Sequence, residues 1–280
     1  LFSAPLHAAT HDVCATGCPY TSINSAIWAA DPGDTVRVGQ GNYEETSGIT
    51  LAGSIALYGG FSNDFATRDP ALYPSSVHGT LSRSTSAEAT ITIDGFEVFG
   101  STGIGIFGNS PHATYLVQNC IVHDHPSVGI YLYRFKSAQI IDNEVYANQQ
   151  YEGIMLPSDG THEQILIRGN SVHGNDCSSC SGIKLLMAQS TDSILNNTVY
   201  QNRVGISVQS ATTASAPLIR GNKVYSNIDD GVYLFYGSPI AERNILKNNG
   251  YAGIYHYAYS PTATPVFNHN IFDANSVAGL

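Results

Sequence analysis

Three short stretches of the chain share one pattern: NSVHGN at residues 170–175, NTVYQN at 197–202 and NKVYSN at 222–227. Each begins and ends with Asn and has Val at its third position. Variants of the pattern occur at NCIVHD (119), NEVYAN (143), NILKNN (244) and NIFDAN (270), so that successive copies lie 24, 27, 27, 25, 22 and 26 residues apart. A recurring period of about 25 residues indicates a repeat architecture with one structural unit per copy.

Two further features recur with the same period. A Gly followed by an aliphatic residue lies between successive copies, at Gly103, Gly129, Gly153, Gly182, Gly205, Gly231, Gly253 and Gly279. An apolar residue stands three positions before each Asn, at Leu116, Ile140, Ile167, Ile194, Ile219, Ala241 and Phe267. Leucine-rich repeats need a denser Leu pattern, and propeller blades need about 40 residues or more. We therefore predict an all-β fold, a right-handed parallel β-helix with coils about 4.8 Å apart.

Stacked coils explain the Asn column. An Asn at a corner between strands tolerates the left-handed backbone conformation that such a turn can need. Its amide can also hydrogen-bond the equivalent amide one coil away, which forms a ladder. The apolar columns then fill the interior, for example Ile121, Val145, Val172, Val199, Val224, Leu246 and Phe272. The repeat therefore predicts architecture first and function only indirectly.

Composition excludes two classes of protein. The 280 residues carry a net charge of −10 with only 12 Lys plus Arg, whereas a nucleic-acid-binding protein usually shows a basic stripe. No run of 18 apolar residues is present, so we expect no membrane insertion. The opening LFSAPLHAATHD is typical of the end of a secretory signal, with Ala8 and Ala9 at the exit, and predicts a secreted or cell-surface protein.

The five cysteines fit an extracellular location. Cys14 and Cys18 are close in sequence, as are Cys177 and Cys180, so each pair can close a small local disulfide. CSSC at 177–180 also resembles half of a zinc or redox motif, but no second CxxC accompanies it. Cys120 is left over and is expected to be a free thiol.

From Ala89 to Leu280 these columns resemble the parallel β-helix repeat proteins of the pectate-lyase-like superfamily. YTSINSAIWAADPGDTVRVGQGNYEE (20–45) and IALYGGFSNDF (55–65) resemble the opening module of secreted bacterial β-helix proteins. Apolar residues recur on one helical face over 22–30, so we predict a short capping helix over about 20–32. The expected organisation is a lead-in over 1–12 and one β-helix domain over 13–280, with regular coils over about 89–280. No cap follows the last coil, which predicts an end-to-end contact or a further domain there.

The strand after each Gly should carry the functional face. Its first outward column is Gly105, Tyr131, Met155, Lys184, Ser207, Tyr233 and Tyr255, and its second is Phe107, Tyr133, Pro157, Leu186, Gln209, Phe235 and Tyr257. Exposed aromatic patches usually mark binding surfaces, and flat rings suit sugars. The alternative is that these rings only cover or stabilise the sheet. A more regular outward column, Tyr146, His173, Tyr200 and Tyr225, is interpreted as structural stacking.

Charged residues on this face indicate a reaction. Lys184 stands among the rings, with Arg134 and Arg203 in neighbouring coils and Glu152, Asp176 and Asp230 nearby. One hypothesis is β-elimination of a uronic-acid polysaccharide, in which Lys184 or Arg134 acts as base or neutralises the carboxylate. Glu152 with Asp176 or Asp230 would hold Ca²⁺. The substrate would lie on Tyr131, Tyr133, Tyr233, Phe235, Tyr255, Tyr257 and Arg203.

Three alternatives stay open. Glu152 and Asp230 can act as paired carboxylates of a glycoside hydrolase, but a separation of three coils, about 14 Å, exceeds what either mechanism uses. HDHP at 123–126 can bind metal or serve as a base, or form a solvated corner with Asp124 in the Asn column. The RxPxxR, NTD, GHG and DPHD signatures of related enzymes are absent, which favours a non-catalytic adhesin or polysaccharide-binding solenoid. The leading expectation is a secreted carbohydrate-active protein that cleaves its ligand.

Overall fold

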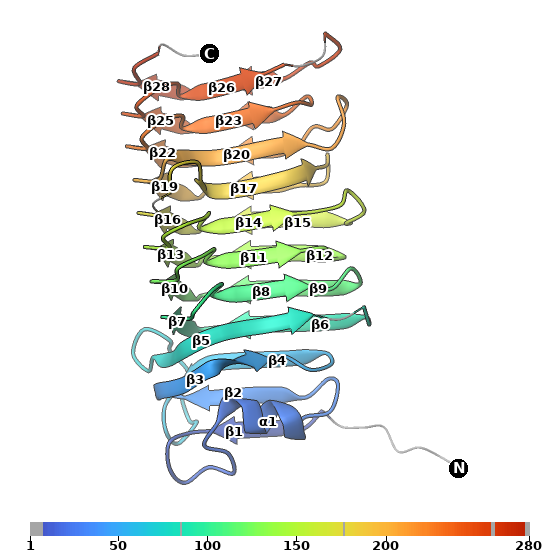
Figure 1. The fold of residues 1–280 in the computed structure, drawn as a ribbon, viewed down its shortest axis with the longest axis vertical. Coiled ribbons are helices and arrows are strands. Elements are labelled where there is room, and N and C mark those ends of the chain that lie inside the picture. The colour runs from blue at the N-terminus through green and yellow to red at the C-terminus, as the bar shows by residue number, and fades with distance from the viewer. Residues whose placement is uncertain (1–7, 85, 176, 259–260, 278–280) are drawn as a thin grey trace, which may run out of the picture.

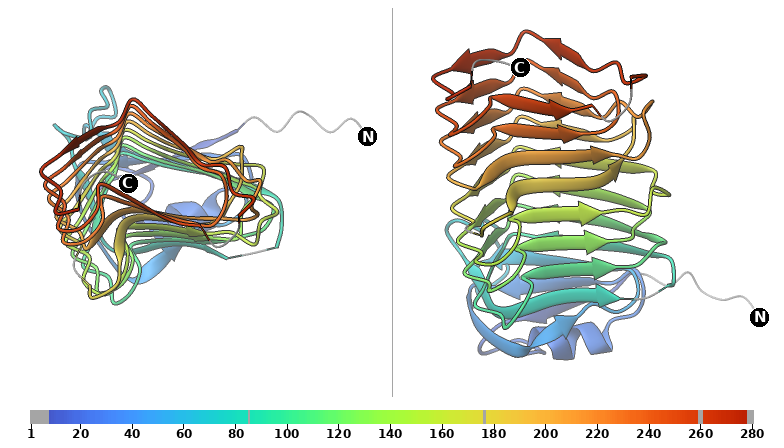
Figure 2. Two further views of the ribbon diagram at one scale, coloured as in Figure 1. Left: turned by 90° about the horizontal axis from the view of Figure 1, so that it is seen from above. Right: turned by 45° about the horizontal axis from the view of Figure 1, so that its top comes forward.

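The computed structural model describes residues 8–84, 86–175, 177–258 and 261–277. The chain winds as a parallel β-helix whose coils stack along one long axis (Figure 1). Seen from above, the coils superpose and enclose a narrow interior (Figure 2). The predicted all-β solenoid with one short helix is confirmed.

One face of the solenoid, here called the back sheet, contains eleven strands in the described residues. They are β1 (Thr10–Val13), β2 (Thr35–Gly39), β4 (Ile55–Phe61), β6 (Ala89–Asp94), β9 (Ala113–Gln118), β12 (Ser137–Ile141), β15 (Gln164–Arg168), β18 (Ser193–Leu195), β21 (Leu218–Arg220), β24 (Ile240–Glu242) and β27 (Val266–Asn268).

Two further faces join through shared strands. The groove sheet comprises β8 (Ile106–Asn109), β11 (Ile130–Tyr133), β14 (Ile154–Pro157), β17 (Ser181–Ala188), β20 (Val204–Ser210), β23 (Val232–Phe235) and β26 (Ile254–Tyr257). The corner sheet comprises β7 (Phe96–Phe99), β10 (Ile121–His123), β13 (Glu144–Tyr146), β16 (Ser171–His173), β19 (Thr198–Tyr200), β22 (Lys223–Tyr225), β25 (Ile245–Lys247) and β28 (Ile271–Asp273). The long strands β3 (Gly41–Thr50) and β5 (Ser75–Ser84) run through both faces, since β5 pairs with β7 and then with β8.

Two Asn ladders run along the corners on either side of the corner sheet, as the repeat predicts. The first joins Asn143, Asn170, Asn197, Asn222, Asn244 and Asn270, and the second joins Asn148, Asn175, Asn202, Asn227, Asn249 and Asn275. The Oδ1 atom of Asn197, for example, accepts both the backbone N–H and the side-chain Nδ2–H of Asn170, each at 2.9 Å. The left-handed conformation belongs to the preceding residue instead, such as Asp142 (φ 53°) or Asn196 (φ 55°), which turns the chain and directs the Asn inward.

The first coils are offset from the predicted alignment. Ile130 pairs with Ile106, so the equivalent of Gly129 is Gly105 rather than Gly103, and Phe107 belongs to the first outward column. At the corner, Val122 pairs with Val145, which makes Ile121 an outward residue that is 38% exposed. Cys120 and His125 therefore occupy the two ladder positions, and the expectation that Asp124 does so is wrong. The backbone N–H of Cys120 donates to Oδ1 of Asn143, and that of His125 donates to Oδ1 of Asn148.

The N-terminal end is covered by helix α1 (Ile23–Ala29), which confirms the predicted capping helix. The Ser22 side chain caps the helix, and the helix buries its own residues Ile23, Ala26 and Ile27 against the first coil. Glu45 accepts the backbone N–H of Ile23 at 2.9 Å, so the first turn is tied to β3. Strand β1 begins at Thr10 and pairs in parallel with β2, whereas residues 1–7 of the predicted lead-in lie outside the described residues.

The two predicted disulfides, Cys14–Cys18 and Cys177–Cys180, are both formed. Cys120 is a free thiol as expected, and its complete burial raises the pKa of the thiol to about 12. Within the described ranges, no helix is long and apolar enough to cross a membrane.

Candidate functional site

The outer face of the groove sheet carries two groups of rings separated by a polar stretch. The lower aromatic cluster consists of Phe107, Tyr131 and Tyr133, in which the Phe107 and Tyr131 rings are parallel with centroids 5.9 Å apart. The upper aromatic cluster consists of Tyr233, Phe235, Tyr255 and Tyr257, with centroids 5.6 Å apart within each stacked pair. Between them the same two columns hold Met155, Lys184 and Ser207, then Pro157, Leu186 and Gln209.

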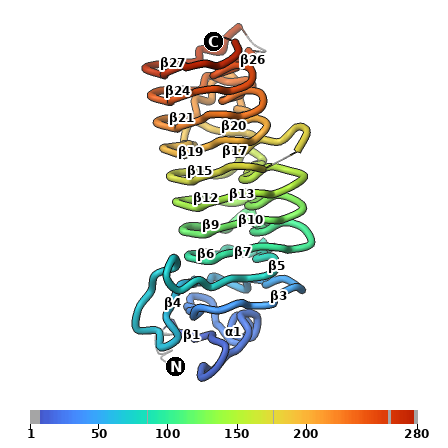
Figure 3. Tube along the Cα trace, turned by 90° about the vertical axis from the view of Figure 1, so that its left-hand side faces the viewer, coloured from blue at the N-terminus to red at the C-terminus, as the bar shows by residue number. Residues whose placement is uncertain are grey.

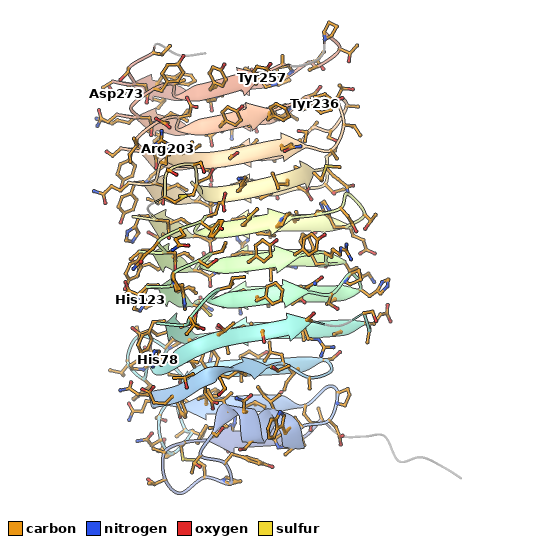
Figure 4. The ribbon with its side chains drawn as sticks, viewed as in Figure 1. His78, His123, Arg203, Tyr236, Tyr257 and Asp273 are labelled. Carbon is orange, nitrogen blue, oxygen red and sulfur yellow. A yellow bond between two sulfur atoms is a disulfide. The ribbon has the colours of Figure 1, made fainter. Side chains whose placement is uncertain are left out.

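The polar stretch opens into a groove of about 520 Å³, here called the central groove. Residues of β17, β20 and β23 and of the turns before them form its wall, including Ser181, Lys184, Leu186, Arg203, Asp229, Asp230, Tyr233 and Phe235. It therefore adjoins the upper aromatic cluster directly. Figure 4 shows Arg203 beside the groove sheet and Tyr257 on β26 above it.

Lys184 and Glu152, which the sequence hypothesis assigned to one open site, are in contact, but Glu152 is buried and does not line the central groove. The Nζ atom of Lys184, on β17, lies 2.7 Å from Oε1 of Glu152, which stands two residues before β14. Glu152 is only 4% exposed, whereas 26% of the Lys184 side chain is exposed. Lys184 therefore presents its charge to the groove while it compensates a buried carboxylate behind it.

A second cation and a buried acid complete the central groove. Arg203 forms an ion pair with Asp229, with Nε and Oδ2 2.9 Å apart. Burial raises the pKa of Asp230, whereas a hydrogen bond from the backbone of Ala252 opposes that shift. The neighbouring charge of Asp229 raises it further. Burial also raises the pKa of Tyr233, which keeps its phenol protonated. The groove thus holds a proton acceptor of raised basicity near two cations and a proton donor.

Arg134 lies outside the central groove. It follows β11 in the left-handed conformation, with φ 52°, and it is exposed. Its guanidinium stands 4.9 Å from the centroid of the Tyr133 ring, a cation–π contact that extends the lower aromatic cluster. The structure therefore places Arg134 with the lower aromatic cluster rather than with Lys184.

The hypothesised metal ligands are not gathered around one point in the described residues. The Glu152 carboxylate is bound to Lys184, and Asp230 lies three coil steps away, before β23. Asp176 lies outside the described residues. Across the described ranges, no three His, Cys, Asp or Glu side chains are grouped to hold a metal ion. A Ca²⁺ requirement stays a prediction from sequence.

The regular aromatic column on the corner sheet is a continuous stack. Its rings are His78, Phe99, His123, Tyr146, His173, Tyr200 and Tyr225, with successive centroids 4.6 to 5.6 Å apart. This confirms structural stacking and extends it toward the N-terminus. Figure 4 shows His78 and His123 along this corner. Because each ring is covered by its neighbours, the stack offers edges rather than faces to a ligand.

A larger groove of about 680 Å³ lies on the corner side, between the segment that joins β4 to β5 and residues of β7, β10 and β13. That segment projects from the solenoid in Figure 3. Its charged lining is mostly acidic, with Asp69, Glu97, Asp142 and Glu144. Its one cation, Arg68, is bound to Asp94 at 2.7 Å. This groove is therefore poorly suited to an acidic polymer, and volume alone does not identify the site.

Ser207 and Gln209, which the outward columns placed on this face, line the central groove together with Asp229. Sequence reasoning assigned no role to Asp229, and it missed a Ser158–His162–Asp192 cluster at the edge of the groove sheet. These turn positions do not repeat from coil to coil, so the column pattern carried no signal for them. His125 was noticed as part of HDHP, but it is buried and bonds Ser101 and Val98, so it is a corner residue.

Solved structures with the same architecture include two epimerase modules from Azotobacter vinelandii. The A-module of the mannuronan C-5 epimerase AlgE6 has a TM-score of 0.67 at 17% identity, covering 92% of this chain and 74% of that chain. The A-module of AlgE4, another mannuronan C-5 epimerase, has a TM-score of 0.52 at 16% identity, covering 90% of each chain. A double mutant of the periplasmic alginate epimerase AlgG has a TM-score of 0.58 at 16% identity, covering 82% of this chain and 64% of that one.

At these identities the similarity shows a shared fold. No curated protein sequence matches the chain significantly. The sequence model for the family described as "Right handed beta helix region" matches residues 102–260 and 193–280, well over half of the chain. The predicted resemblance to pectate-lyase-like β-helix proteins is thereby confirmed at the level of fold. The chain belongs to the right-handed β-helix family.

Proposed function

We propose that the protein is secreted, binds an acidic polysaccharide along the outer face of the groove sheet, and cleaves it by β-elimination in the central groove. The observation that carries the proposal is the order of features on one strand face. Two aromatic clusters flank a groove that contains Lys184, Arg203 and the acid Asp230. Carbohydrate sites combine ring platforms with a few placed polar groups in this way.

The dimensions suit an extended polymer. Phe107 and Tyr255 occupy one outward column, six coil steps apart, which corresponds to about 29 Å at the usual strand spacing. A chain that runs parallel to the solenoid axis would pass the lower cluster, the central groove and the upper cluster in turn. The two groove cations favour a polymer with carboxylates rather than a neutral one.

The proposed reaction assigns one role to each group. Asp230 takes the proton from C5 of a uronosyl residue, and the electrons of that C–H bond form the C4–C5 double bond. The C4–O4 bond breaks, and Tyr233 supplies the proton that the leaving oxygen needs. Lys184 and Arg203 neutralise the carboxylate while charge develops on it. Lys184 acts here as a cation rather than a base, because it already forms an ion pair with the buried Glu152.

Two independent features support this assignment. The structurally similar proteins are named as mannuronan C-5 and alginate epimerases, which supports a carbohydrate ligand by analogy of fold. The two disulfides are typical of proteins outside the reducing cytosol, and one of those relatives is named as periplasmic.

One observation favours a second candidate, a polysaccharide-binding solenoid without catalysis. Both groove cations already form ion pairs with carboxylates: Lys184 with Glu152, and Arg203 with Asp229. Such pairs hold the side chains in place for recognition but reduce the charge available to a reacting substrate. The hydrolase alternative is disfavoured because Glu152 is bound to Lys184 and lies three coil steps from Asp230.

A panel assay separates the candidates. The protein is incubated with alginate, pectate and other uronans, with and without Ca²⁺, and absorbance from new C4–C5 double bonds is followed. The proposal expects absorbance to rise on at least one uronan, and expects Asp230→Asn to abolish the rise while binding persists. Binding without any rise would establish the non-catalytic solenoid, and neither binding nor turnover on acidic polymers would overturn both.

A further inference from the structure

Ser158, His162 and Asp192 form a chain of hydrogen bonds beside the groove sheet. Ser158 immediately follows β14, His162 lies in the turn between β14 and β15, and Asp192 lies one coil further on, between β17 and β18. Oγ of Ser158 is 2.5 Å from Nδ1 of His162, and Nε2 of His162 is 2.8 Å from Oδ2 of Asp192. We propose that these three residues are a second catalytic site, in which Ser158 is the nucleophile of a hydrolase for small carboxylic esters.

The surrounding donors determine the direction of the chain. Asp192 accepts the backbone N–H of Ile165 at 2.9 Å and of Gln189 at 2.7 Å, so both of its side-chain oxygens act as acceptors. Nε2 of His162 then donates to Asp192, which leaves Nδ1 as an acceptor. The hydroxyl of Ser158 donates to that Nδ1. A nucleophile bonded to a base, which is oriented by an acid, is the arrangement that activates serine in unrelated hydrolases.

Burial fits these roles. The side chains of His162 and Asp192 are both 0% exposed, so their hydrogen bond is shielded from water. The ring of Phe135 covers His162, with centroids 5.5 Å apart. Ser158 is the most exposed of the three residues, at 8%. The backbone N–H of Gly160 donates to its Oγ at 2.9 Å, and this donor can stabilise negative charge as the hydroxyl loses its proton.

The location indicates where an ester would come from. Pro157, the residue before Ser158, pairs with Leu186, which lines the central groove. The backbone N–H of Ser158 itself bonds the Leu186 carbonyl at 3.3 Å. We therefore take an O-acyl group on a polysaccharide bound in that groove as the candidate ester. The sugar part of this substrate rests on the proposed function, whereas the ester chemistry does not.

The reaction balances without a cofactor. Oγ of Ser158 attacks the ester carbonyl as its proton moves to Nδ1 of His162. The alcohol leaves with that proton, and the acyl group stays on Ser158. Water then attacks the acyl-serine with His162 again as base, which releases the carboxylic acid and restores the hydroxyl. Asp192 stabilises the imidazolium in both steps without accepting its proton.

A covalent probe tests the site without any polysaccharide, so its outcome is independent of the proposed function. A fluorophosphonate reporter forms a bond from Ser158 Oγ to phosphorus and expels fluoride, and peptide mass spectrometry locates the adduct. We expect the native protein to be labelled at Ser158 and Ser158→Ala not to be labelled. Asp192→Asn should label at least tenfold more slowly. The control Ser190→Ala, an exposed serine of the neighbouring turn, should label like wild type.

Hydrolysis of p-nitrophenyl acetate by the same variants should follow the labelling. The adduct on the native protein is sufficient even if Ser158→Ala does not fold. A native protein with an intact melting transition that acquires no adduct, or acquires it at another residue, would overturn the proposal. A cluster that only stabilises the turn would produce that result.

Discussion

The ammonium group of Lys184 lies 2.7 Å from a carboxylate oxygen of Glu152, a residue 32 positions earlier in the chain and one coil below. The contact exists because strand register places β17 directly on β14. It connects the architecture to the proposed site, since the same lysine lines the central groove. Its energetic contribution to folding and its contribution to ligand binding can be separated.

Removal of the lysine alone should destabilise the protein. In Lys184→Ala the Glu152 carboxylate stays buried without its partner, which should lower the free energy of unfolding by about 2 kcal/mol. This is below the cost for a fully buried pair, because 26% of the Lys184 side chain is exposed. Denaturant titration of Lys184→Ala and of the double variant Lys184→Met, Glu152→Gln checks the origin of the loss. The double variant should recover most of the stability and still bind uronans poorly, whereas normal binding would exclude Lys184 from the site.

The two aromatic arrangements should respond differently to truncation. Tyr131→Ala and Tyr233→Ala each remove a half-buried ring of the two aromatic clusters on the groove sheet, so each should weaken polysaccharide binding about tenfold. Tyr200→Ala, in the corner stack, removes a ring that is covered on both sides, at 4.6 and 5.0 Å between centroids. It should lower the melting temperature and leave the Kd unchanged. Calorimetric titration measures both, and equal losses of affinity in all three variants would contradict the distinction.

The Asn ladder should be costly to interrupt. In Asn197→Ala, the backbone N–H and side-chain Nδ2–H of Asn170 both lose their shared acceptor in a buried corner. The Nδ2 group keeps the carbonyls of Ile140 and Arg168 as acceptors, but the buried backbone N–H is left unsatisfied, which should lower the free energy of unfolding by about 2 kcal/mol. Gln150→Ala, at an exposed position of an earlier turn, is the matched polar control and should change stability little. A ladder variant as stable as this control would show that the backbone ladders alone hold the coils.

The His78–Glu44 pair should stabilise the fold in acid. A hydrogen bond to Glu44, 2.7 Å away, raises the pKa of His78 above its ordinary value of 6.5, although partial desolvation opposes the shift. The contribution is therefore fully present below pH 6.5 and is lost as pH rises through the raised pKa. His78→Gln should lower the melting temperature more at about pH 5 than at about pH 9. A difference that grows toward alkaline pH would contradict the assigned direction.

The repeating parts of the molecule were predictable from sequence, because each column position recurs under the same constraints. Val172 must be buried and Asn170 must bond its neighbours in any stacked coil, so their spacing predicts the fold. The first coils were aligned wrongly from sequence. Cys120 and His125 stand where later coils have the two ladder Asn, so the repeat pattern that begins at Asn119 is offset from the true ladder position by one residue.

The site depends on positions that break the repeat, and these were only partly predictable. The rarity of Lys and its place on the aromatic face made Lys184 a candidate, and its position near these acids made Glu152 and Asp230 candidates as well. The turn geometry that places Asp229 against Arg203 was not in the pattern. Nor was the turn that carries His162 to Asp192 across 30 residues. Such contacts depend on individual loop conformations, for which one sequence offers no periodic signal.

The most direct test of the central claim is mass spectrometry of the oligosaccharides formed when the protein is incubated with each uronan. β-Elimination leaves a C4–C5 double bond at the new non-reducing end. The fragment that carries this end is therefore lighter by one water than the fragment that hydrolysis of the same bond would produce. We predict these lighter fragments with the native protein and none with Asp230→Asn. Fragments that carry the full water, or a polymer that is bound and remains intact, would contradict the assignment of the central groove as a site of β-elimination.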